Sequence, residues 1–395
     1  MTNKILQLDF SNTEIAFQSK NNAELRTSYL LFKAIGINWL VKMGTPLVEI
    51  AFALHLPIKP LIKHTVYKQF VGGEDINDCE LAIDNLYKFG IGTILDYSVE
   101  GKEAEEDFDY TCKETIDTIN KAKNNPKIPF CVFKVTGVAR FALLEKLNNN
   151  IPLNVDEQVE FEKVVNRIDS ICKTAYENNV RLFIDAEETW IQIAIDNLAT
   201  QMMQKYNKEK AIVFNTLQLY RHDRLAFLKE SHQQAISNNY YLGVKLVRGA
   251  YMEKERARAK ELNYIDPIQP TKEKSDIDYN EALAYCIDHI DRISICAGTH
   301  NENSSLYLAQ LMSDNQIKNN DNRIYFSQLY GMSDNLSYNL ANAGYNVAKY
   351  LPYGPVKAVM PYLFRRAAEN TSVAGQTGRE LNLILKERAR RAKTK

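Results

Sequence analysis

Two adjacent arginines near the end of the chain are well suited to binding an anion. Arg365 and Arg366 stand in a helical pattern that also carries Tyr362 and Glu369, and three- and four-residue spacings bring these side chains to one side of a helix. Two guanidinium groups can hold a carboxylate or a phosphate through bidentate, charge-assisted hydrogen bonds. The alternative is a solvated arginine pair bonded to Glu369.

Single charges inside apolar runs form a second group. Lys134 follows Val-Phe, Lys245 lies within Gly-Val-Lys-Leu-Val, and Asp185 ends Leu-Phe-Ile-Asp. A charge in an apolar strand is costly unless it is paired or used in function. We therefore favour functional roles for both lysines, while Asp185 is either a buried partner of one of them or a ligand-facing carboxylate.

The elements that must position these residues form a repeating pattern. Short β-rich runs alternate with longer helical patterns from about residue 90 onward, which predicts an α/β fold, a (βα)8 TIM-type barrel. A doubly wound open sheet is the competing architecture, but no glycine-rich dinucleotide turn follows any of these runs. The expected strands are 93–97, 130–135, 181–185, 211–216, 241–247, 293–297, 323–329 and 346–351.

Ligands of such a barrel bind at the carboxyl ends of its strands, so polar residues there are candidate site residues. His300 could equally be a buried core histidine, and we expect Glu187 and Glu188 to form a solvated strand-to-helix turn. The strand-end candidates are Asp96, Tyr97, Lys134, Thr136, Asp185, Asn215, Gln218, Lys245, Arg248, Thr299, His300, Asn301, Gln328, Leu329 and Tyr350.

Composition limits the function classes. The 395 residues include 49 basic and 49 acidic side chains, so no global field favours nucleic acid or an anionic membrane. Six scattered cysteines without a Cys-x-x-Cys pair indicate a reducing compartment and predict no metal site. The first residues carry no apolar signal core, which argues against a presequence and favours a cytoplasmic protein.

The remaining segments give simpler expectations. We expect residues 1–70 to form an N-terminal helical arm and 71–395 the barrel domain. Within the arm, 47–61 is too interrupted for a membrane span and predicts a helix pair packed on the body or lying on a surface. Further along the chain we expect a solvated acidic loop at 103–109, a charged helix at 253–260, a long loop at 263–278, and a frayed basic tail at 386–395 with membrane-surface attraction as the alternative.

Taken together, the motifs resemble the proline dehydrogenase family, flavoenzymes with a distorted (βα)8 barrel. The resemblance covers about 90 to 380 in the right order, and the arm is similar to that of the longer, eukaryote-like branch. The matching stretches are Phe-Lys134-Val-Thr, Ile-Asp185-Ala-Glu-Glu, Gln218-Leu-Tyr, Lys245-Leu-Val-Arg248-Gly-Ala-Tyr, Thr299-His300-Asn, Gln328-Leu329-Tyr-Gly-Met and Tyr350 through Arg365-Arg366-Ala-Ala-Glu369.

This resemblance implies bound FAD and oxidation of L-proline to 1-pyrroline-5-carboxylate. Asp185 and Lys245 would be catalytic, and Glu100 would pair with Arg365 over the bound substrate. The substrate would meet Lys134, Leu329, Tyr350, Tyr362, Arg365 and Arg366. The flavin would meet Gln218, Lys245, Arg248, Gly249, Ala250, Thr299, His300, Gln328 and Glu369.

The resemblance also implies a membrane quinone as electron acceptor, and hence a peripheral position on the inner membrane. A pyrroline-5-carboxylate dehydrogenase is a candidate downstream partner. Many bacterial members have Arg and Lys where this chain has Lys245 and Arg248, an exchange that keeps both cations.

Three alternatives remain open. Hydroxyproline-preferring members carry a smaller residue at the position of Tyr350, so this tyrosine favours proline. A flavin-free lyase could use Lys134 or Lys245 as a Schiff-base nucleophile beside Asp185. A non-catalytic amino-acid binder on the same barrel would bind proline without reducing a dye.

Overall fold

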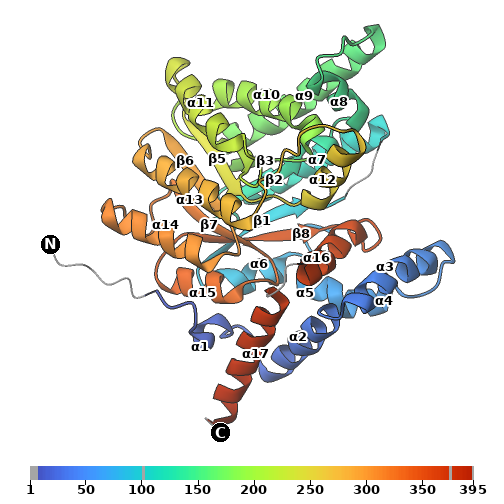
Figure 1. Cartoon of the computed structure of the whole chain (residues 1–395), viewed down its shortest axis with the longest axis vertical. Helices are drawn as coiled ribbons and strands as arrows, with labels where there is room; N and C mark the ends of the chain where they lie inside the picture. The colour runs from blue at the N-terminus through green and yellow to red at the C-terminus, as the bar shows by residue number, and fades with distance from the viewer. Residues whose placement is uncertain (1–7, 100–102, 373–375, 394–395) are drawn as a thin grey trace. The chain divides into compact units, whose positions relative to one another are not determined.

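A computed structural model describes residues 8–99, 103–372 and 376–393, with side chains described at all of these except 38–43, 45, 49, 368–372 and 376–377. In the described chain, eight strands close into a barrel in sequence order (Figure 1). This confirms the predicted (βα)8 architecture. The strands are β1 Ile91–Tyr97, β2 Phe130–Lys134, β3 Arg181–Asp185, β4 Val213–Gln218, β5 Leu242–Val247, β6 Ile293–Gly298, β7 Ile324–Leu329 and β8 Val347–Tyr353.

Each strand lies within two residues of its expected position at both ends. One difference is at the end of β8, which we expected at residue 351. The strand instead runs through Pro352 to Tyr353, because proline lacks only the N–H group and its carbonyl still accepts a hydrogen bond from Gly72 N at 2.8 Å. Gly354, at a positive φ of 144°, follows the strand.

The described chain divides into two compact units, Gly101–Ser327 and Gln7–Glu100 with Gln328–Lys395. The first unit contains β2 to β6 and most of β7. Its aromatic core lies inside these strands, where Phe130 and Phe183 stack with ring centroids 4.4 Å apart and Phe214 meets both edge-on. The helices of this unit are α7 Glu105–Ala122, α8 Phe141–Asn148, α9 Val155–Glu177, α10 Thr189–Tyr206, α11 Arg224–Ser237, α12 Met252–Glu261, α13 Lys272–Asp288 and α14 Glu302–Asp314, with the 3-10 turn η2 at Val135–Gly137.

Two segments of this unit are more ordered than expected. The acidic run at 103–109 was predicted to be a loop, but from Glu105 on it forms the first turn of α7, since Glu105 and Asp109 pair with the buried Arg167. The predicted loop at 263–278 ends early, because the Thr271 hydroxyl caps α13 by accepting from Lys274 N at 3.3 Å. The charged helix expected at 253–260 is confirmed as α12.

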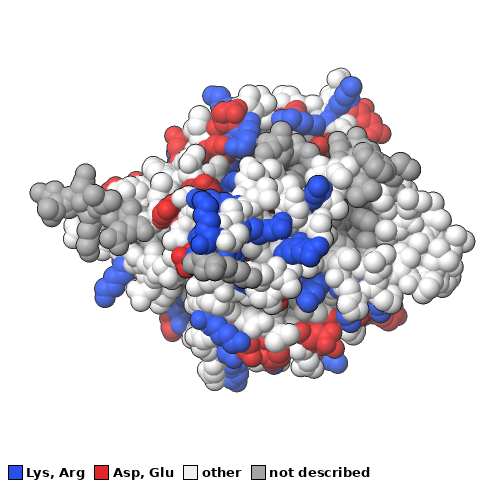
Figure 2. Space-filling model, turned by 90° about the horizontal axis from the view of Figure 1, so that it is seen from below, with Lys and Arg blue, Asp and Glu red and all other residues white. Residues whose placement is uncertain are grey.

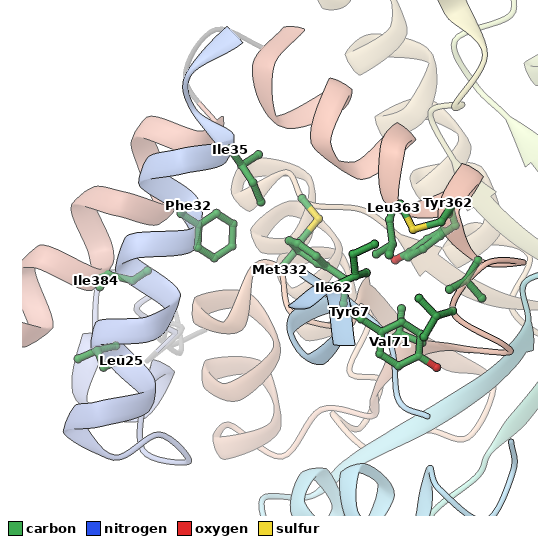
Figure 3. Close-up of a cluster of buried hydrophobic side chains, with 14 of the residues drawn as sticks. Leu25, Phe32, Ile35, Ile62, Tyr67, Val71, Met332, Tyr362, Leu363 and Ile384 are labelled. Carbon is green, nitrogen blue, oxygen red and sulfur yellow. The ribbon is translucent and has the colours of Figure 1, made fainter. Parts of the chain in front are cut away.

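The second unit combines β1 and β8 with the N-terminal and C-terminal helices. A buried cluster that includes Leu25, Phe32, Tyr67, Leu363 and Ile384 joins the N-terminal and C-terminal helices (Figure 3). Its helices are α1 Thr13–Ala16, α2 Asn22–Ile35, α3 Asn38–Ala53, α4 Lys59–Ile62, the π-turn η1 Lys63–Tyr67, α5 Lys68–Phe70, α6 Glu80–Tyr87, α15 Asp334–Asn342, α16 Met360–Ser372 and α17 Gln376–Lys393.

The C-terminal segment is not the frayed tail that the sequence suggested, as far as Lys393. It forms α17, which packs against α2 in the second unit. Glu387 is fully buried in this helix and accepts hydrogen bonds from Arg390 and Arg391, while Arg391 also donates to Phe17 O at 2.9 Å. Part of the basic charge of the tail is therefore used to fix the helix in place.

A buried ion cluster lies beside β8. Lys349 is fully buried and donates to Asp334 Oδ1 at 2.8 Å and to Met332 O at 2.5 Å, while Lys20 pairs with the other carboxylate oxygen of Asp334 at 3.0 Å. Burial alone would raise the pKa of Asp334, but the two ammonium groups hold the pKa well below its usual value. The cluster thus ties β8 to α15 and to the segment before α2.

Candidate active site

A buried ion pair between Lys245 and Asp185 is the centre of the candidate site in the first unit. The Lys245 ammonium binds Asp185 Oδ1, and its nitrogen lies 5.2 Å from the centroid of the Phe183 ring. The Thr216 hydroxyl donates to the same carboxylate oxygen at 3.4 Å. Because the parallel register aligns Thr216 with Lys245, the two strands present these side chains side by side. Asp185 is half-buried and is accordingly the ion-pair partner of a strand lysine.

Lys134 ends the neighbouring strand β2 and is the register partner of Asp185. Its side chain is half-buried. Strand ends thus bring Lys134, Asp185 and Lys245 to one rim of β2, β3 and β5, as the sequence predicted.

Glu187 was predicted to lie in a solvated turn, and this prediction is wrong. Its side chain is only 4% exposed, and both carboxylate oxygens accept hydrogen bonds from Thr136, one from the backbone N–H at 3.0 Å and one from the hydroxyl. Burial raises the pKa of Glu187 to about 7, against the opposing effects of the Lys134 ammonium and the two Thr136 donors. Glu188 is buried as well and pairs with Lys254 at 2.5 Å.

The backbone of Glu187 is held by two glutamines. Gln192 Oε1 accepts from Glu187 N at 2.8 Å, and Gln218 Nε2 donates to Glu187 O at 2.7 Å. Gln192 in turn donates to Asp196, which pairs with the buried Arg224 at 2.7 Å. This network was not foreseen from the sequence, and it fixes the side-chain amide of Gln218 at the end of β4.

Arg248, directly after β5, forms a second cationic position. Its guanidinium donates to Asp276 at 2.6 Å, to the Thr299 hydroxyl at 2.8 Å and to the Ser304 hydroxyl at 2.9 Å. The same group lies 4.3 Å from the centroid of the Tyr279 ring. In the structure Thr299 is therefore a hydrogen-bond partner of Arg248. Sequence spacing alone could not have revealed this contact.

The backbone directly after Arg248 packs closely against the ring of Tyr220. Gly249 has φ 141°, and a Cβ placed on it would lie 2.3 Å from the ring of Tyr220, so only glycine fits. Ala250 is exposed and His300 is half-buried just after β6.

In the second unit, α16 carries the arginine pair. Arg366 is buried and its guanidinium lies 5.3 Å from the centroid of the Tyr362 ring, as the four-residue spacing predicted. Arg365 is half-buried. The side chain of Glu369 and the whole of Glu100 lie outside the described residues.

The strand-end candidates of the second unit lie on β7 and β8. Tyr350 is buried, and its carbonyl accepts from Tyr330 N at 2.8 Å. Leu329 packs against the buried cluster, and the buried Gln328 accepts from the Ser337 hydroxyl at 2.8 Å.

No group of three or more His, Cys, Asp or Glu side chains that could hold a metal ion occurs within 8–99, 103–372 and 376–393. The six cysteines are free and buried.

Comparison with known proteins identifies the family. A family model described as proline dehydrogenase matches residues 79–379. Proline dehydrogenase 1, mitochondrial, of Dictyostelium discoideum is 33% identical over 98% of this chain and 76% of its own length. The carbapenem antibiotics biosynthesis protein CarD of Pectobacterium carotovorum is 35% identical over 82% of this chain and 83% of its own length. Hydroxyproline dehydrogenase of Xenopus laevis is 30% identical over 97% of this chain and 90% of its own length.

Solved structures agree on the fold. Proline utilization A from Bdellovibrio bacteriovorus superposes with a TM-score of 0.70 at 18% identity, covering 92% of this chain. This chain spans about a third of that longer protein, 36% of its length. The family model and the curated relatives together show that the chain is an enzyme of the proline dehydrogenase family.

Proposed function

We propose that this chain oxidises L-proline to 1-pyrroline-5-carboxylate with FAD as its cofactor, as the first step of proline catabolism. A hydride leaves the ring carbon on the far side of the nitrogen from the carboxylate, and the nitrogen loses a proton, so that a C=N bond forms. The observation that carries the proposal is the buried Lys245–Asp185 ion pair at the strand ends of a chain in this family.

The residues present fit a flavin nucleotide. Arg248 is a cation held rigidly by three hydrogen-bond partners, which suits a phosphate or a polar ribityl chain. Gly249 adds no side chain next to Arg248, and the following residue, Ala250, is exposed. Bound FAD supplies the hydride acceptor. We propose that Gln218, Lys245, Arg248, Gly249, Ala250, Thr299, His300, Gln328 and Glu369 hold it.

Lys245 has the charge needed beside such a cofactor. A buried ammonium would stabilise negative charge that develops next to it, because a water-poor surrounding strengthens the interaction. Asp185 orients the ammonium and balances its charge before the reaction. Both are therefore proposed as catalytic residues.

The substrate would be bound by cations and aromatic rings. We propose that Arg365 and Arg366 bind the proline carboxylate and that Lys134 contributes to the polar end of the site. The stacking of Arg366 on Tyr362 supports this role, because it holds a guanidinium plane in a fixed orientation. Leu329 and Tyr350 would contact the ring.

Two alternative reactions can be weighed against these observations. A relative named hydroxyproline dehydrogenase is similar over nearly the whole chain, so trans-4-hydroxyproline is the second candidate substrate. The bulk of Tyr350 favours proline, and Tyr350→Ser should shift preference toward the hydroxylated ring. A Schiff-base lyase needs a neutral lysine, whereas Lys245 is ion-paired to Asp185.

We propose a membrane quinone as the electron acceptor and a pyrroline-5-carboxylate dehydrogenase as the enzyme that receives the product. The relative of Dictyostelium discoideum is named as mitochondrial. No described helix of this chain is long and apolar enough to cross a bilayer. We propose that the protein lies peripherally on a membrane, where it would meet such a quinone.

The test is an absorbance spectrum of the purified protein followed by anaerobic addition of L-proline. The proposal predicts a flavin spectrum that bleaches with proline. Lys245→Met should retain a folded protein but slow bleaching by at least about a hundredfold, the usual cost of a lost electrostatic group. A protein that binds no FAD after reconstitution would refute the proposed reaction.

A further inference from the structure

The helix pair α3–α4 of the second unit has an unusual outer surface. Five large aliphatic side chains on it are each between 50% and 67% exposed, a group that we call the apolar tip: Leu47, Ile50, Leu54, Leu56 and Leu61. A surface helix normally turns polar residues to water. Contiguous exposed apolar surface of this kind usually marks an interaction site.

The same helices also bury apolar side chains on their inner side. Phe52 and Ile58 pack against the buried cluster, and Ile62 belongs to it. The inner face therefore already anchors the pair to the second unit, and the apolar tip is not needed for that packing. The outer face is available for a different partner.

Basic side chains accompany the apolar tip in the second unit. Residues 20–68 and 376–393 together contain thirteen Lys and Arg against four Asp and Glu, although the whole chain has a net charge of zero. Of these acids, Glu380 and Glu387 are buried. Figure 2 shows Lys and Arg side chains gathered on the face that carries the lower helices, beside a lobe almost without charge. Exposed cations of these segments include Arg26, Lys33, Lys68, Lys386, Arg388 and Lys393. Lys59 and Lys63 are exposed as well, but both pair with Glu74, at 3.1 and 2.8 Å.

These segments form one body within the second unit. α17 packs against α2, with Arg388 4.9 Å from the centroid of the Tyr29 ring, and Ile384, Leu25 and Phe32 share the buried cluster that α3 and α4 also contact (Figure 3). The cations and the apolar tip are thus held on a common scaffold.

We propose that the apolar tip inserts into the surface of an anionic lipid bilayer, with the surrounding Lys and Arg side chains contacting the headgroups. Apolar residues flanked by cations are the pattern of interfacial rather than spanning helices. A second copy of this chain fits less well, because a two-fold interface sets the same surface against itself and would face cations with cations. Binding to a bilayer would bring the protein close to the proposed quinone acceptor. The biological purpose of the surface rests on that proposed function, whereas its assignment as a lipid-binding surface does not.

The test uses the full-length chain with vesicles of phosphatidylcholine alone and with about 30% phosphatidylglycerol, in a sedimentation assay. Wild type should bind the anionic vesicles, with binding that weakens steeply as salt rises because cations contribute about fivefold each. Leu54→Gln with Leu56→Gln should weaken binding by at least about tenfold, since burying one leucine is worth roughly that factor. Lys33→Gln with Lys68→Gln should lower binding to the anionic vesicles only.

A matched control carries the same chemical change elsewhere. Leu81→Gln with Ile265→Gln replaces two aliphatic residues that are 72% and 86% exposed outside the apolar tip, and it should bind vesicles like wild type. Proline-dependent reduction of a soluble dye should be unchanged in the apolar-tip variant. Vesicle binding without dye reduction would refute the proposed reaction but still support the docking surface.

Three outcomes would overturn the inference. These are wild type that binds neither vesicle, an apolar-tip variant that binds as well as wild type, and a control variant that loses binding equally. A wild-type dimer that becomes monomeric in the apolar-tip variant, without vesicle binding, would assign the surface to a second copy instead.

Discussion

Replacing Glu187 by glutamine should make this protein more stable at alkaline pH than wild type. The side chain is buried, and the shift of its pKa from the ordinary 4.5 to about 7 means that the folded protein prefers the protonated form. A difference of this size corresponds to about 3 kcal/mol between the two protonation states. Glutamine is permanently neutral and can still accept from Thr136 N and donate to the Thr136 hydroxyl.

The sign follows from linkage. Between pH 4.5 and 7 the folded state holds the proton of Glu187 more tightly than the unfolded state does, so the free energy of unfolding falls as pH rises. The contribution is fully present below pH 4.5 and is lost as pH rises through 7. The variant has no such loss, so its advantage over wild type should grow by about 2–3 kcal/mol between pH 5 and pH 8.

The assay is the thermal midpoint of both proteins at several pH values. With about 2–4 °C per kcal/mol for a unit of 150–250 residues, the difference between variant and wild type should rise by at least about 4 °C over this range. Glu188→Gln is the matched control, because that carboxylate pairs with Lys254 at 2.5 Å and its loss should lower the midpoint at pH 8. A difference between Glu187→Gln and wild type that does not change with pH would refute the reasoning.

Three further predictions concern two buried charged or titratable groups and one glycine. Lys349→Met should destabilise the fold by about 3–5 kcal/mol, because it leaves the buried Asp334 with one cation fewer, and urea unfolding would measure the loss. Burial and the neighbouring His289 lower the pKa of His232, so its stabilising contribution is present above pH 6.5 and is lost as pH falls; His232→Gln should therefore reduce the drop in thermal midpoint between pH 7.5 and 5.5. Gly249→Ala should weaken FAD retention by tenfold or more in equilibrium dialysis, because its Cβ would meet a ring at 2.3 Å and its φ is 141°.

The strands were predictable because their cause is local. Alternating β-rich and helical runs predicted every strand to within two residues, and the barrel they form brings Lys245 and Asp185 to one rim. The end of β8 was expected at residue 351, because proline often ends a strand, whereas the strand continues through Pro352 to Tyr353. The carbonyl of Pro352 accepts from Gly72, a partner that lies far away in sequence.

Burial of charges was harder to predict, since it depends on partners in other elements. Glu187 follows a strand and precedes a helix, which is where solvated carboxylates are common. Its burial comes from Thr136 on another βα connection, a contact that no spacing encodes. A retrospective signal was available in the strand register, which aligns Lys134 with Asp185 and so brings the segment after β2 beside the segment after β3.

Net charge was the least informative feature of the sequence, and the structure explains why. In the first unit, buried charges have local partners, as in Lys245 with Asp185 and Arg224 with Asp196, so these charges cancel at short range. The segments 20–68 and 376–393 instead hold nine more basic than acidic residues, and the rest of the chain holds the compensating acidic excess. Screening limits the reach of exposed charges to about 10 Å, so a bilayer would respond to the local excess rather than to the total. A chain of zero net charge can therefore carry a cationic surface, and our composition-based argument against attraction to an anionic membrane applies only to the average field.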